Sequence, residues 1–355
     1  MELLNKTIMG IKPVDEPAKG ETVKHLDSLV KPIGSLGTLE KIAAQLSGIT
    51  GQRSNTFEKK CTIVMAADNG IHEEGVSSCP QEITAVQTIN MTKGLTGICV
   101  LSEYAGAEVV VVDIGVKGDL NTAGIINKKI SHGTNNIAKG PAMTQEQAVQ
   151  AFETGIEVVG ELVSKGYKLF GTGEMGICNT STSSAVLMAL TDISVEHAVG
   201  KGAGLTDADY ENKKRVIVRA LELNKPDRND VLDVITKVGG YDIAGMAGCF
   251  LAAAYYRVPI VIDGFISTVA ALAAYKLNPL VKDYMFASHS SEELGYKHAI
   301  HILGLEPMLN LHMRLGEGTG CPLAFNIIEA SQAVVKNMAT FEQGAINDDF
   351  LVDIR

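Results

Sequence analysis

The chain has 355 residues and a formal net charge of −10, from 31 Lys and Arg against 41 Asp and Glu. A surface that binds duplex nucleic acid needs a positive field, so this charge balance argues against a nucleic-acid partner. Apolar residues make up 46% of the chain and charged residues 20%, which excludes a largely disordered protein. A chain of this length buries enough apolar surface to fold without disulfides or a structural metal.

The sequence predicts neither a membrane span nor a secretion signal. The longest nearly apolar run, Ile243 to Tyr256, is too short to cross a bilayer, and the N-terminal segment lacks the apolar stretch of a signal peptide. The six cysteines are scattered and form no CxxC pair, which is typical of reduced thiols. His298 and His301 have no cysteine nearby, so we expect no metal site. We therefore expect a cytoplasmic protein with no membrane partner.

Six short apolar segments are predicted to be buried strands. Most are apolar on both faces, as strands of a parallel sheet covered by helices must be. Helical patterns lie between them, and the clearest runs from Thr144 to Lys165 and opens with a capping-box pair, Thr144 and Gln147. This alternation predicts an α/β fold with a parallel sheet flanked by helices. The predicted strands are Cys61–Ala67, Glu108–Val112, Tyr167–Phe170, Val258–Ile262, Tyr284–Ala287 and Leu309–Leu315.

The two ends of the chain differ from its centre. The first 60 residues contain a Pro- and Gly-rich segment, Lys31–Glu40, then a helix-like stretch and a polar linker. From Leu323 onward the pattern is helical again. We predict a smaller helical domain built from residues 1–60 and 325–355, and a large α/β catalytic domain over residues 61–324.

Glycine-containing or small polar turns follow the predicted strands. Asp68, Asn69 and Gly70 follow the first strand, and Asp263 and Gly264 follow the fourth. One such strand end is ordinary turn chemistry. In parallel α/β sheets, however, the ligand crevice lies outside the carboxyl ends of the strands. The repetition of polar ends therefore predicts a polar site spread along one edge of the sheet.

One glycine pattern suggests an alternative function. Gly171, Gly173 and Gly176 match the spacing of dinucleotide-binding loops, which would make the protein an NAD-dependent oxidoreductase. Glu174 argues against this function, because a carboxylate inside such a loop would repel a diphosphate. The hydroxyl-rich run 179–184 that follows either binds one phosphate or caps a helix, and both interpretations stay open.

Gly202 and Gly204 lie in a second glycine turn, before a helix predicted from Thr206 to roughly Leu223. Backbone N–H groups in such a turn can hold phosphate oxygens, although a capped helix start is the simpler explanation. No P-loop motif is present in the sequence.

Glu317 lies among the glycines of the segment 314–320, after the sixth predicted strand. A carboxylate with few side-chain neighbours can act as a general base once a ligand desolvates it. An isolated turn glutamate more often only solvates its loop. Its place at a strand end favours the catalytic interpretation.

Taken in chain order, the glycine-rich and polar segments resemble those of the nicotinate-nucleotide–dimethylbenzimidazole phosphoribosyltransferase family. This family belongs to the lower-ligand branch of cobalamin synthesis. The most specific motifs are KPIGSLGTLE, GEMGICNTSTSS and RLGEGTG, and the resemblance covers nearly the whole chain. Cys178 departs from the family pattern, which usually has glycine or another small residue at this position. The resemblance implies a Rossmann-like fold, a homodimer, and no cofactor or metal.

The resemblance also implies the reaction. Family members transfer 5-phosphoribosyl from nicotinate mononucleotide to 5,6-dimethylbenzimidazole or a related base with inversion, giving α-ribazole 5′-phosphate and nicotinate. The leaving pyridinium is already cationic and needs no acid, whereas the attacking base must lose a proton. The resemblance assigns Glu317 as the general base and Glu174 as an acid that stabilises positive charge at C1′.

Binding residues are implied in the same way. Arg314 is expected to pair with a phosphate or a carboxylate. The residues expected near the phosphoribosyl group are Gly176, Gly202, Gly204, Asp263, Gly264 and Ser291. The residues expected to line the benzimidazole pocket are Ser77, Pro80, Thr84 and Gln87. Besides the oxidoreductase, a non-catalytic nucleotide sensor remains an alternative, which would bind nicotinate mononucleotide without turnover.

Overall fold

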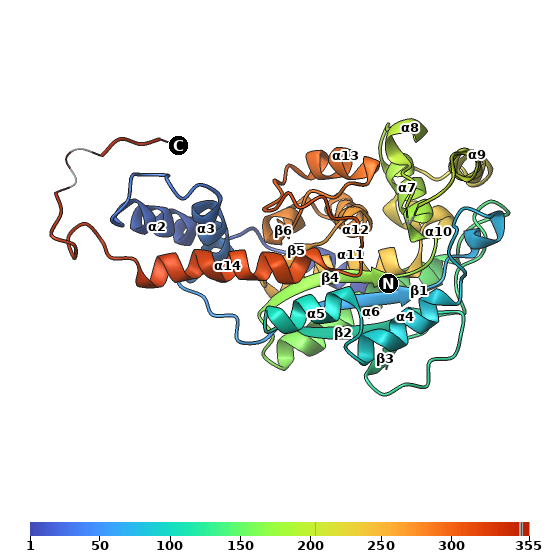
Figure 1. Cartoon of the computed structure of the whole chain (residues 1–355), viewed down its shortest axis with the longest axis horizontal. Coiled ribbons are helices and arrows are strands. Elements are labelled where there is room, and N and C mark those ends of the chain that lie inside the picture. The colour runs from blue at the N-terminus through green and yellow to red at the C-terminus, as the bar shows by residue number, and fades with distance from the viewer. Residues whose placement is uncertain (203, 348, 350, 355) are drawn as a thin grey trace.

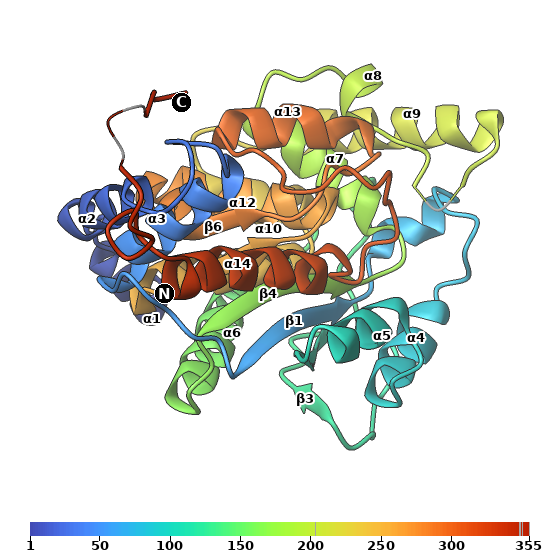
Figure 2. The same ribbon diagram turned by 60° about the vertical axis from the view of Figure 1, so that its left-hand side comes forward.

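The computed structural model of the chain describes residues 1–202, 204–347, 349 and 351–354. Its centre is a six-stranded sheet whose neighbouring strands are all parallel, in the order β3-β2-β1-β4-β5-β6. Helices cover both faces of this sheet (Figure 1, Figure 2). This is the strand order of doubly wound folds, so the predicted α/β class is confirmed. The strands are β1 (Lys60–Ala67), β2 (Glu108–Gly115), β3 (Ile125–Asn127), β4 (Leu169–Met175), β5 (Ile260–Ile262) and β6 (Met285–Ala287).

Helices alternate with the strands along the chain. The capping box predicted for Thr144 and Gln147 is present at the start of α6, and Thr206 caps α9. Among the described residues, none of the helices is both long and apolar enough to cross a membrane. The helices are α1 (Glu2–Gly10), α2 (Glu16–Asp27), α3 (Thr38–Thr50), η1 (Gly70–Glu74), α4 (Ile83–Thr92), α5 (Gly97–Tyr104), α6 (Gln145–Ser164), α7 (Asn179–Leu190), α8 (Val195–Ala198), α9 (Asp207–Asn224), α10 (Val231–Val238), α11 (Tyr241–Tyr256), α12 (Phe265–Leu277), η2 (Pro279–Tyr284), α13 (Leu294–Leu303) and α14 (Gly320–Asn337).

Alternate residues of β1 pack against different helical layers. Ile63 and Met65 belong to the large apolar core that includes Phe152 of α6 and much of α11. Val64 and Ala66 belong to a second core with residues of α4 and α5. Successive side chains of a strand point to opposite faces, so both faces of β1 are covered and the strand is buried along its length. This double burial is the physical reason for its continuous apolar sequence.

One predicted strand is wrong, and one observed strand lies outside the prediction. The segment Leu309–Leu315 makes one isolated bridge and then turns, with His312 in the left-handed region at φ 55°. Leu311 and Leu315 are 52% and 64% exposed, so the apolar residues that suggested a strand are partly surface leucines of a loop. The remaining strand of the sheet is β3, a short edge strand without a buried residue to mark it.

β4 is longer than the predicted strand, which stopped before the glycine-rich sequence. Gly171 and Gly173 lie inside β4. Other parts of the chain approach both positions so closely that a side chain would not fit there. A Cβ at Gly171 would lie 2.5 Å from Cβ of Cys321, and one at Gly173 would lie 2.3 Å from the carbonyl oxygen of Glu317. These glycines make space for protein rather than for a pyrophosphate, which weakens the dinucleotide-binding interpretation.

The terminal helices lie partly together. α2 packs against α3, and α14 begins beside β4 and β5 and then runs along α3 (Figure 1). Lys31 and Glu40 form a buried ion pair at 2.9 Å, which links the segment before α3 to the first turn of that helix. α1 instead contacts α6 and α11 of the larger body. The domain boundaries drawn from the sequence at residues 60 and 324 stay a prediction.

Candidate active site

A cavity of about 840 Å³ opens at the carboxyl ends of the central strands. Segments far apart in the sequence meet there: the loop before α4, the end of β4, the turn before α9, the starts of α7 and α12, and the loop before α14. Both predicted catalytic acids, Glu174 and Glu317, line this cavity. The predicted binding residues that line it are Ser77, Gln87, Gly176, Gly202, Gly204, Asp263, Gly264, Ser291 and Arg314.

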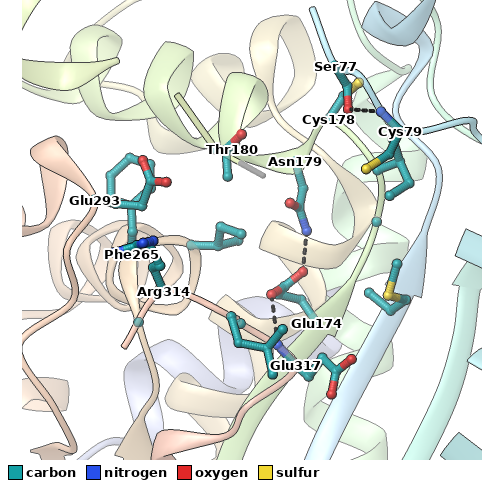
Figure 3. A pocket seen from close by; sticks show the side chains of 18 of the residues that line it. Ser77, Cys79, Glu174, Cys178, Asn179, Thr180, Phe265, Glu293, Arg314 and Glu317 are labelled. Carbon is teal, nitrogen blue, oxygen red and sulfur yellow. Dashed lines mark hydrogen bonds between the residues drawn. The ribbon is translucent and has the colours of Figure 1, made fainter. Parts of the chain in front are cut away.

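Glu174 lies at the end of β4, and hydrogen bonds hold both of its carboxylate oxygens (Figure 3). Its Oε1 accepts from the backbone N–H of Glu317 at 3.2 Å, and its Oε2 accepts from the side-chain amide of Asn179. The same amide donates to Asp242 at 3.2 Å. Burial, aided by the charges of Asp242 and Asp263, raises the pKa of Glu174 to about 8. Glu174 is therefore mainly protonated near neutral pH.

Glu317 is oriented by two neutral donors. Nε2 of Gln87 donates to its Oε1 and the backbone N–H of Ile98 donates to its Oε2, both at 3.1 Å. Ile98 is in the first turn of α5, where the helix dipole favours a negative charge. Neutral donors fix the carboxylate without cancelling its charge, and lone pairs remain to accept a proton.

The backbone at Glu317 is in the left-handed region at φ 61°. This conformation costs a non-glycine residue roughly 1–2 kcal/mol, so it persists only where surrounding contacts enforce it. The glycines on either side, Gly316 at φ 87° and Gly318 at φ 94°, adopt the same region without that cost. The glycine-rich motif thus serves to turn the Glu317 side chain into the cavity.

Lys213 supplies positive charge to the cavity wall. Its ammonium donates to Oγ1 of Thr180 at 2.9 Å and to the carbonyl of Gly200 at 3.0 Å, and these bonds use two of its three N–H donors. Burial lowers the pKa of Lys213 to about 8. No sequence motif marks Lys213, which lies within the charged helix α9. The sequence feature nearest to Lys213 that suggests a binding site is the glycine turn before α9.

The residues predicted for the benzimidazole pocket do not all reach the cavity. Ser77 and Gln87 line it, whereas Pro80 is exposed and lies outside its lining. Thr84 is fully buried behind the wall, where its hydroxyl accepts from the backbone N–H of Ile177 at 3.1 Å. The lining also includes the apolar side chains of Val76 and Ile83 and the thiol of Cys79, which were not predicted.

Cys178 occupies a position that favours glycine. It is the residue before α7 and has a φ of 73°. Glycine adopts this conformation without a Cβ penalty, which accounts for the small residue expected there from the family pattern. Cys178 is buried in the cavity wall, and burial raises the pKa of its thiol to about 12. The departure from the family pattern therefore adds a protonated thiol and little else.

A doubly wound parallel sheet with a large polar cavity at its carboxyl edge defines an α/β enzyme that acts on a small molecule. The oriented carboxylate of Glu317 and the buried ammonium of Lys213 fit a substrate with an acidic proton and an anionic group. Comparison with known proteins makes the class more specific. A family described as phosphoribosyltransferase matches residues 11–346 of the chain.

Relatives match this chain over almost its entire length. A protein of Clostridium tetani is 55% identical over 356 residues, covering 100% of this chain and 98% of the relative. One of Clostridium acetobutylicum is 54% identical over 343 residues, covering 97% of each. Both are named nicotinate-nucleotide–dimethylbenzimidazole phosphoribosyltransferase. The crystal structure of CobT from Thermus thermophilus has a TM-score of 0.90 at 35% identity, covering 94% of this chain and 99% of that chain. The chain belongs to the nicotinate-nucleotide–dimethylbenzimidazole phosphoribosyltransferase family, as its motifs predicted.

Proposed function

We propose that this protein transfers 5-phosphoribosyl from nicotinate mononucleotide to 5,6-dimethylbenzimidazole or a related base. The products are α-ribazole 5′-phosphate and nicotinate, for assembly of the cobalamin nucleotide loop. The observation that carries the proposal is the carboxylate of Glu317, which neutral donors orient in the cavity of a chain with full-length relatives of this name. Holding both substrates in line in one cavity supplies much of the rate.

Glu317 acts as the general base in this reaction. One benzimidazole nitrogen attacks C1′ of the ribose while the other nitrogen gives up its proton to Glu317. The pair of hydrogen bonds from Gln87 and Ile98 keeps the carboxylate aimed at that proton. The C1′–N electron pair returns to the pyridinium nitrogen as the bond breaks, so this nitrogen becomes neutral and nicotinate departs without a proton donor. Attack opposite the leaving group inverts the configuration at C1′.

Glu174 faces the positive charge that develops at C1′ in the transition state. Its carboxyl is largely protonated near neutral pH, since burial raises its pKa to about 8. A bound pyridinium cation favours the ionised form of a neighbouring carboxyl, so substrate binding releases the proton of Glu174 to solvent. The resulting carboxylate stabilises oxocarbenium character at C1′.

The phosphate of nicotinate mononucleotide is held near Lys213 and the start of α7. Support comes from the buried ammonium of Lys213, the hydroxyl of Ser291 and the glycine turn at Gly202 and Gly204, all in the cavity lining. Glycine turns allow a phosphate to approach backbone N–H groups closely. Arg314 lies in the same lining and pairs with the phosphate or with the nicotinate carboxylate.

We also propose that the protein is a homodimer. A patch of exposed apolar side chains on α4 and α5 supports this, since such patches mark interaction surfaces. Val86 is 51% exposed, Val100 58% and Tyr104 79%. Ile83 and Leu315, 40% and 64% exposed, continue the patch to the cavity lining. Sedimentation of wild type and Val100→Asp tests the proposal, which predicts a dimer and a weakened dimer respectively.

We assign the protein to the cytoplasm. All six cysteines are free, and five of them are buried. Thiols in this state suit a reducing compartment.

The reaction is tested by incubating the purified protein with nicotinate mononucleotide and 5,6-dimethylbenzimidazole, without added metal, and detecting products by chromatography and mass. We expect nicotinate and α-ribazole 5′-phosphate in equal amounts. Binding of nicotinate mononucleotide without nicotinate release, with this base and with a panel of purines and phenols, would favour the sensor alternative and contradict the transfer. Reduction of NAD would favour the oxidoreductase.

A further inference from the structure

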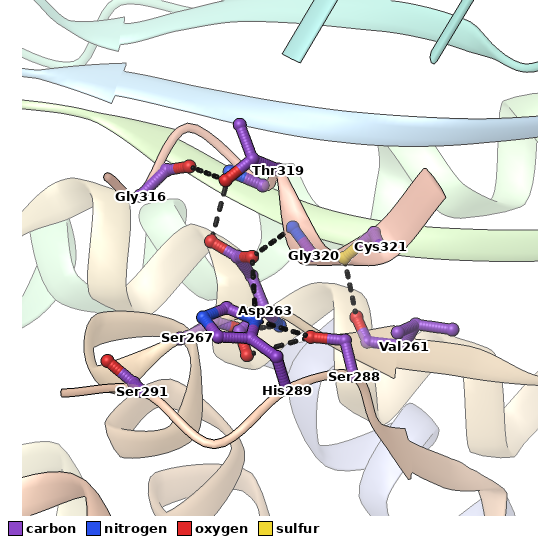
Figure 4. A network of polar contacts seen from close by, with 12 residues as sticks. Val261, Asp263, Ser267, Ser288, His289, Ser291, Gly316, Thr319, Gly320 and Cys321 are labelled. Atoms are coloured by element: carbon purple, nitrogen blue, oxygen red, sulfur yellow. Dashed lines mark hydrogen bonds and ion pairs between the residues drawn. The ribbon is translucent and has the colours of Figure 1, made fainter. Parts of the chain in front are cut away.

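We propose that Asp263 is a positioning residue for Glu317 and acts through the backbone of the glycine loop 316–320 rather than on the substrate. The inference rests on the proposed function, since it takes Glu317 to be the general base. Asp263 directly follows β5 and is 3% exposed. Its carboxylate lies against the loop that carries Glu317 (Figure 4).

The carboxylate of Asp263 holds two backbone N–H groups just beyond Glu317. Its Oδ2 accepts from the N–H of Gly318 at 3.1 Å, and its Oδ1 accepts from the N–H of Gly320 at 2.7 Å. When this carboxyl is ionised, such hydrogen bonds are roughly twice as strong as those between neutral groups. A single buried side chain thus spans the chain from the residue after Glu317 to the first residue of α14.

The loop needs such an external acceptor for two reasons. Glu317 has a positive φ of 61° between two conformationally free glycines, and a non-glycine residue keeps this conformation only where surrounding contacts enforce it. The N–H groups of the first turn of α14 have no partner within the helix. Asp263 satisfies the N–H of Gly320 and adds a negative charge at this N-terminus, which the helix dipole favours.

Asp263 is itself fixed from two other elements. Its backbone N–H donates to Oγ of Ser267 in α12 at 3.1 Å. The hydroxyl of Ser288, just after β6, donates to its carbonyl oxygen at 3.0 Å. Nδ1 of His289 lies 3.8 Å from its Oδ1. The loop position is therefore tied to the ends of β5 and β6.

Two buried carboxyl groups consequently share the backbone of the glycine loop. Glu174 accepts from the N–H of Glu317, and Asp263 accepts from the next N–H groups along the chain. If Asp263 no longer accepts, the loop is free to move away from Gln87 and Ile98, which orient the Glu317 carboxylate. A displacement of about 1 Å at a reacting group costs about a hundredfold in rate.

The test is a double-mutant cycle with Asp263→Asn and Glu317→Gln, measured as kcat and KM for nicotinate mononucleotide. The amide of Asp263→Asn keeps one acceptor oxygen but turns a donor toward the other N–H. We expect Asp263→Asn to lower kcat about 10- to 100-fold, with KM within about twofold of wild type. In the Glu317→Gln background we expect the same change to have almost no further effect, because no base remains to be positioned.

Two outcomes would overturn the inference. Losses that multiply in the double variant would mean that Asp263 acts independently of Glu317. A raised KM with unchanged kcat would mean that it binds substrate. A different result would contradict the assignment of Glu317 as the base. In that case Glu317→Gln would turn over as fast as wild type, whatever the effect of Asp263→Asn.

Asp113→Asn is the matched control. Asp113 is also buried, at the end of β2, and accepts from the N–H of Val116 at 2.9 Å, but it lies outside the cavity lining. We expect it to keep the wild-type kcat. If Asp263→Asn does not fold, Ser267→Ala replaces it in the cycle, because the Ser267 hydroxyl accepts from the N–H of Asp263. If Ser267→Ala lowers kcat in the wild-type background but not in the Glu317→Gln background, the result supports positioning. Equal losses of kcat in the two backgrounds, or no loss in either, contradict it.

Discussion

The backbone N–H of Glu317 donates to Oε1 of Glu174 at 3.2 Å, although the two residues are 143 positions apart in the sequence. One acid ends a central strand, and the other lies in the loop before α14 (Figure 3). The hydrogen bond sets the distance between the proposed base and the acid that we propose stabilises charge at C1′. The two acids therefore form one unit, and a change at either one is expected to disturb the other.

The buried carboxyls predict that the ligand-free protein loses stability as the pH rises. Burial raises the pKa of Glu174 to about 8, that of Asp263 to about 7 and that of Asp242 to about 6. Such a group binds more protons in the folded than in the unfolded chain. Its stabilising contribution is therefore complete below the unfolded pKa of about 4 and is lost as the pH rises through the folded pKa.

We expect the Tm of the ligand-free protein to fall from about pH 5 to about pH 8 and to fall less steeply in Glu174→Gln, which cannot ionise. His289 and Lys213, whose pKa values burial lowers, have the opposite effect. Burial also raises the pKa values of Asp68, Asp283 and Glu293, and these carboxyls add to the fall. The measurement is thermal unfolding at a series of pH values in both proteins. A Tm that rises over this range, or equal slopes in the two proteins, would contradict the prediction.

Gly173→Ala is expected to damage catalysis through the Glu317 loop. A Cβ at Gly173 would lie 2.3 Å from the carbonyl oxygen of Glu317, which is backbone and cannot rotate away. Displacement of the loop should lower kcat at least about tenfold. The control is Gly20→Ala in α2, where a Cβ has nothing within 4 Å. This control should keep its activity and gain about 0.5–1 kcal/mol of stability. Full activity of Gly173→Ala would contradict the prediction, because it would show that displacement of the Glu317 loop does not impair catalysis.

Lys213→Met is expected to weaken binding of nicotinate mononucleotide. Losing a hydrogen bond to a charged group raises KM by about 10- to 100-fold, while kcat changes less. The matched control is Lys214→Met, because the neighbouring Lys214 pairs with Glu211 at 2.6 Å and lies outside the cavity lining. Steady-state kinetics with varied nicotinate mononucleotide distinguish the two. An unchanged KM in Lys213→Met would remove the phosphate role of Lys213.

Local sequence predicted those parts of the fold that local physics decides. β1 is buried on both faces and therefore reads as a continuous apolar run. α6 begins at a capping box, which is a signal confined to neighbouring residues. The family motifs predict Glu174 and Glu317 as site residues, and the structure brings both into one cavity.

The features that the sequence did not predict depend on contacts between distant segments. Asp242 precedes a long apolar stretch of α11, and its bond to Asn179 exists only in the folded chain. The glycines inside β4 look like a turn, because the loop that fills the space beside them lies more than a hundred residues away in the sequence. The loop Leu309–Leu315 carries a strand-like pattern because exposed leucines and buried ones look the same in a sequence.

The most direct test of the central claim is the single-turnover rate of nicotinate release from nicotinate mononucleotide and 5,6-dimethylbenzimidazole, compared between wild type and Glu317→Gln. Glutamine keeps the size of the side chain but cannot take the proton of the attacking base. The account predicts a rate about 10²- to 10⁴-fold lower in the variant, as for loss of a general base, with nicotinate mononucleotide bound as tightly as in wild type. Release at the wild-type rate would contradict it and would require another group in the cavity to accept the proton.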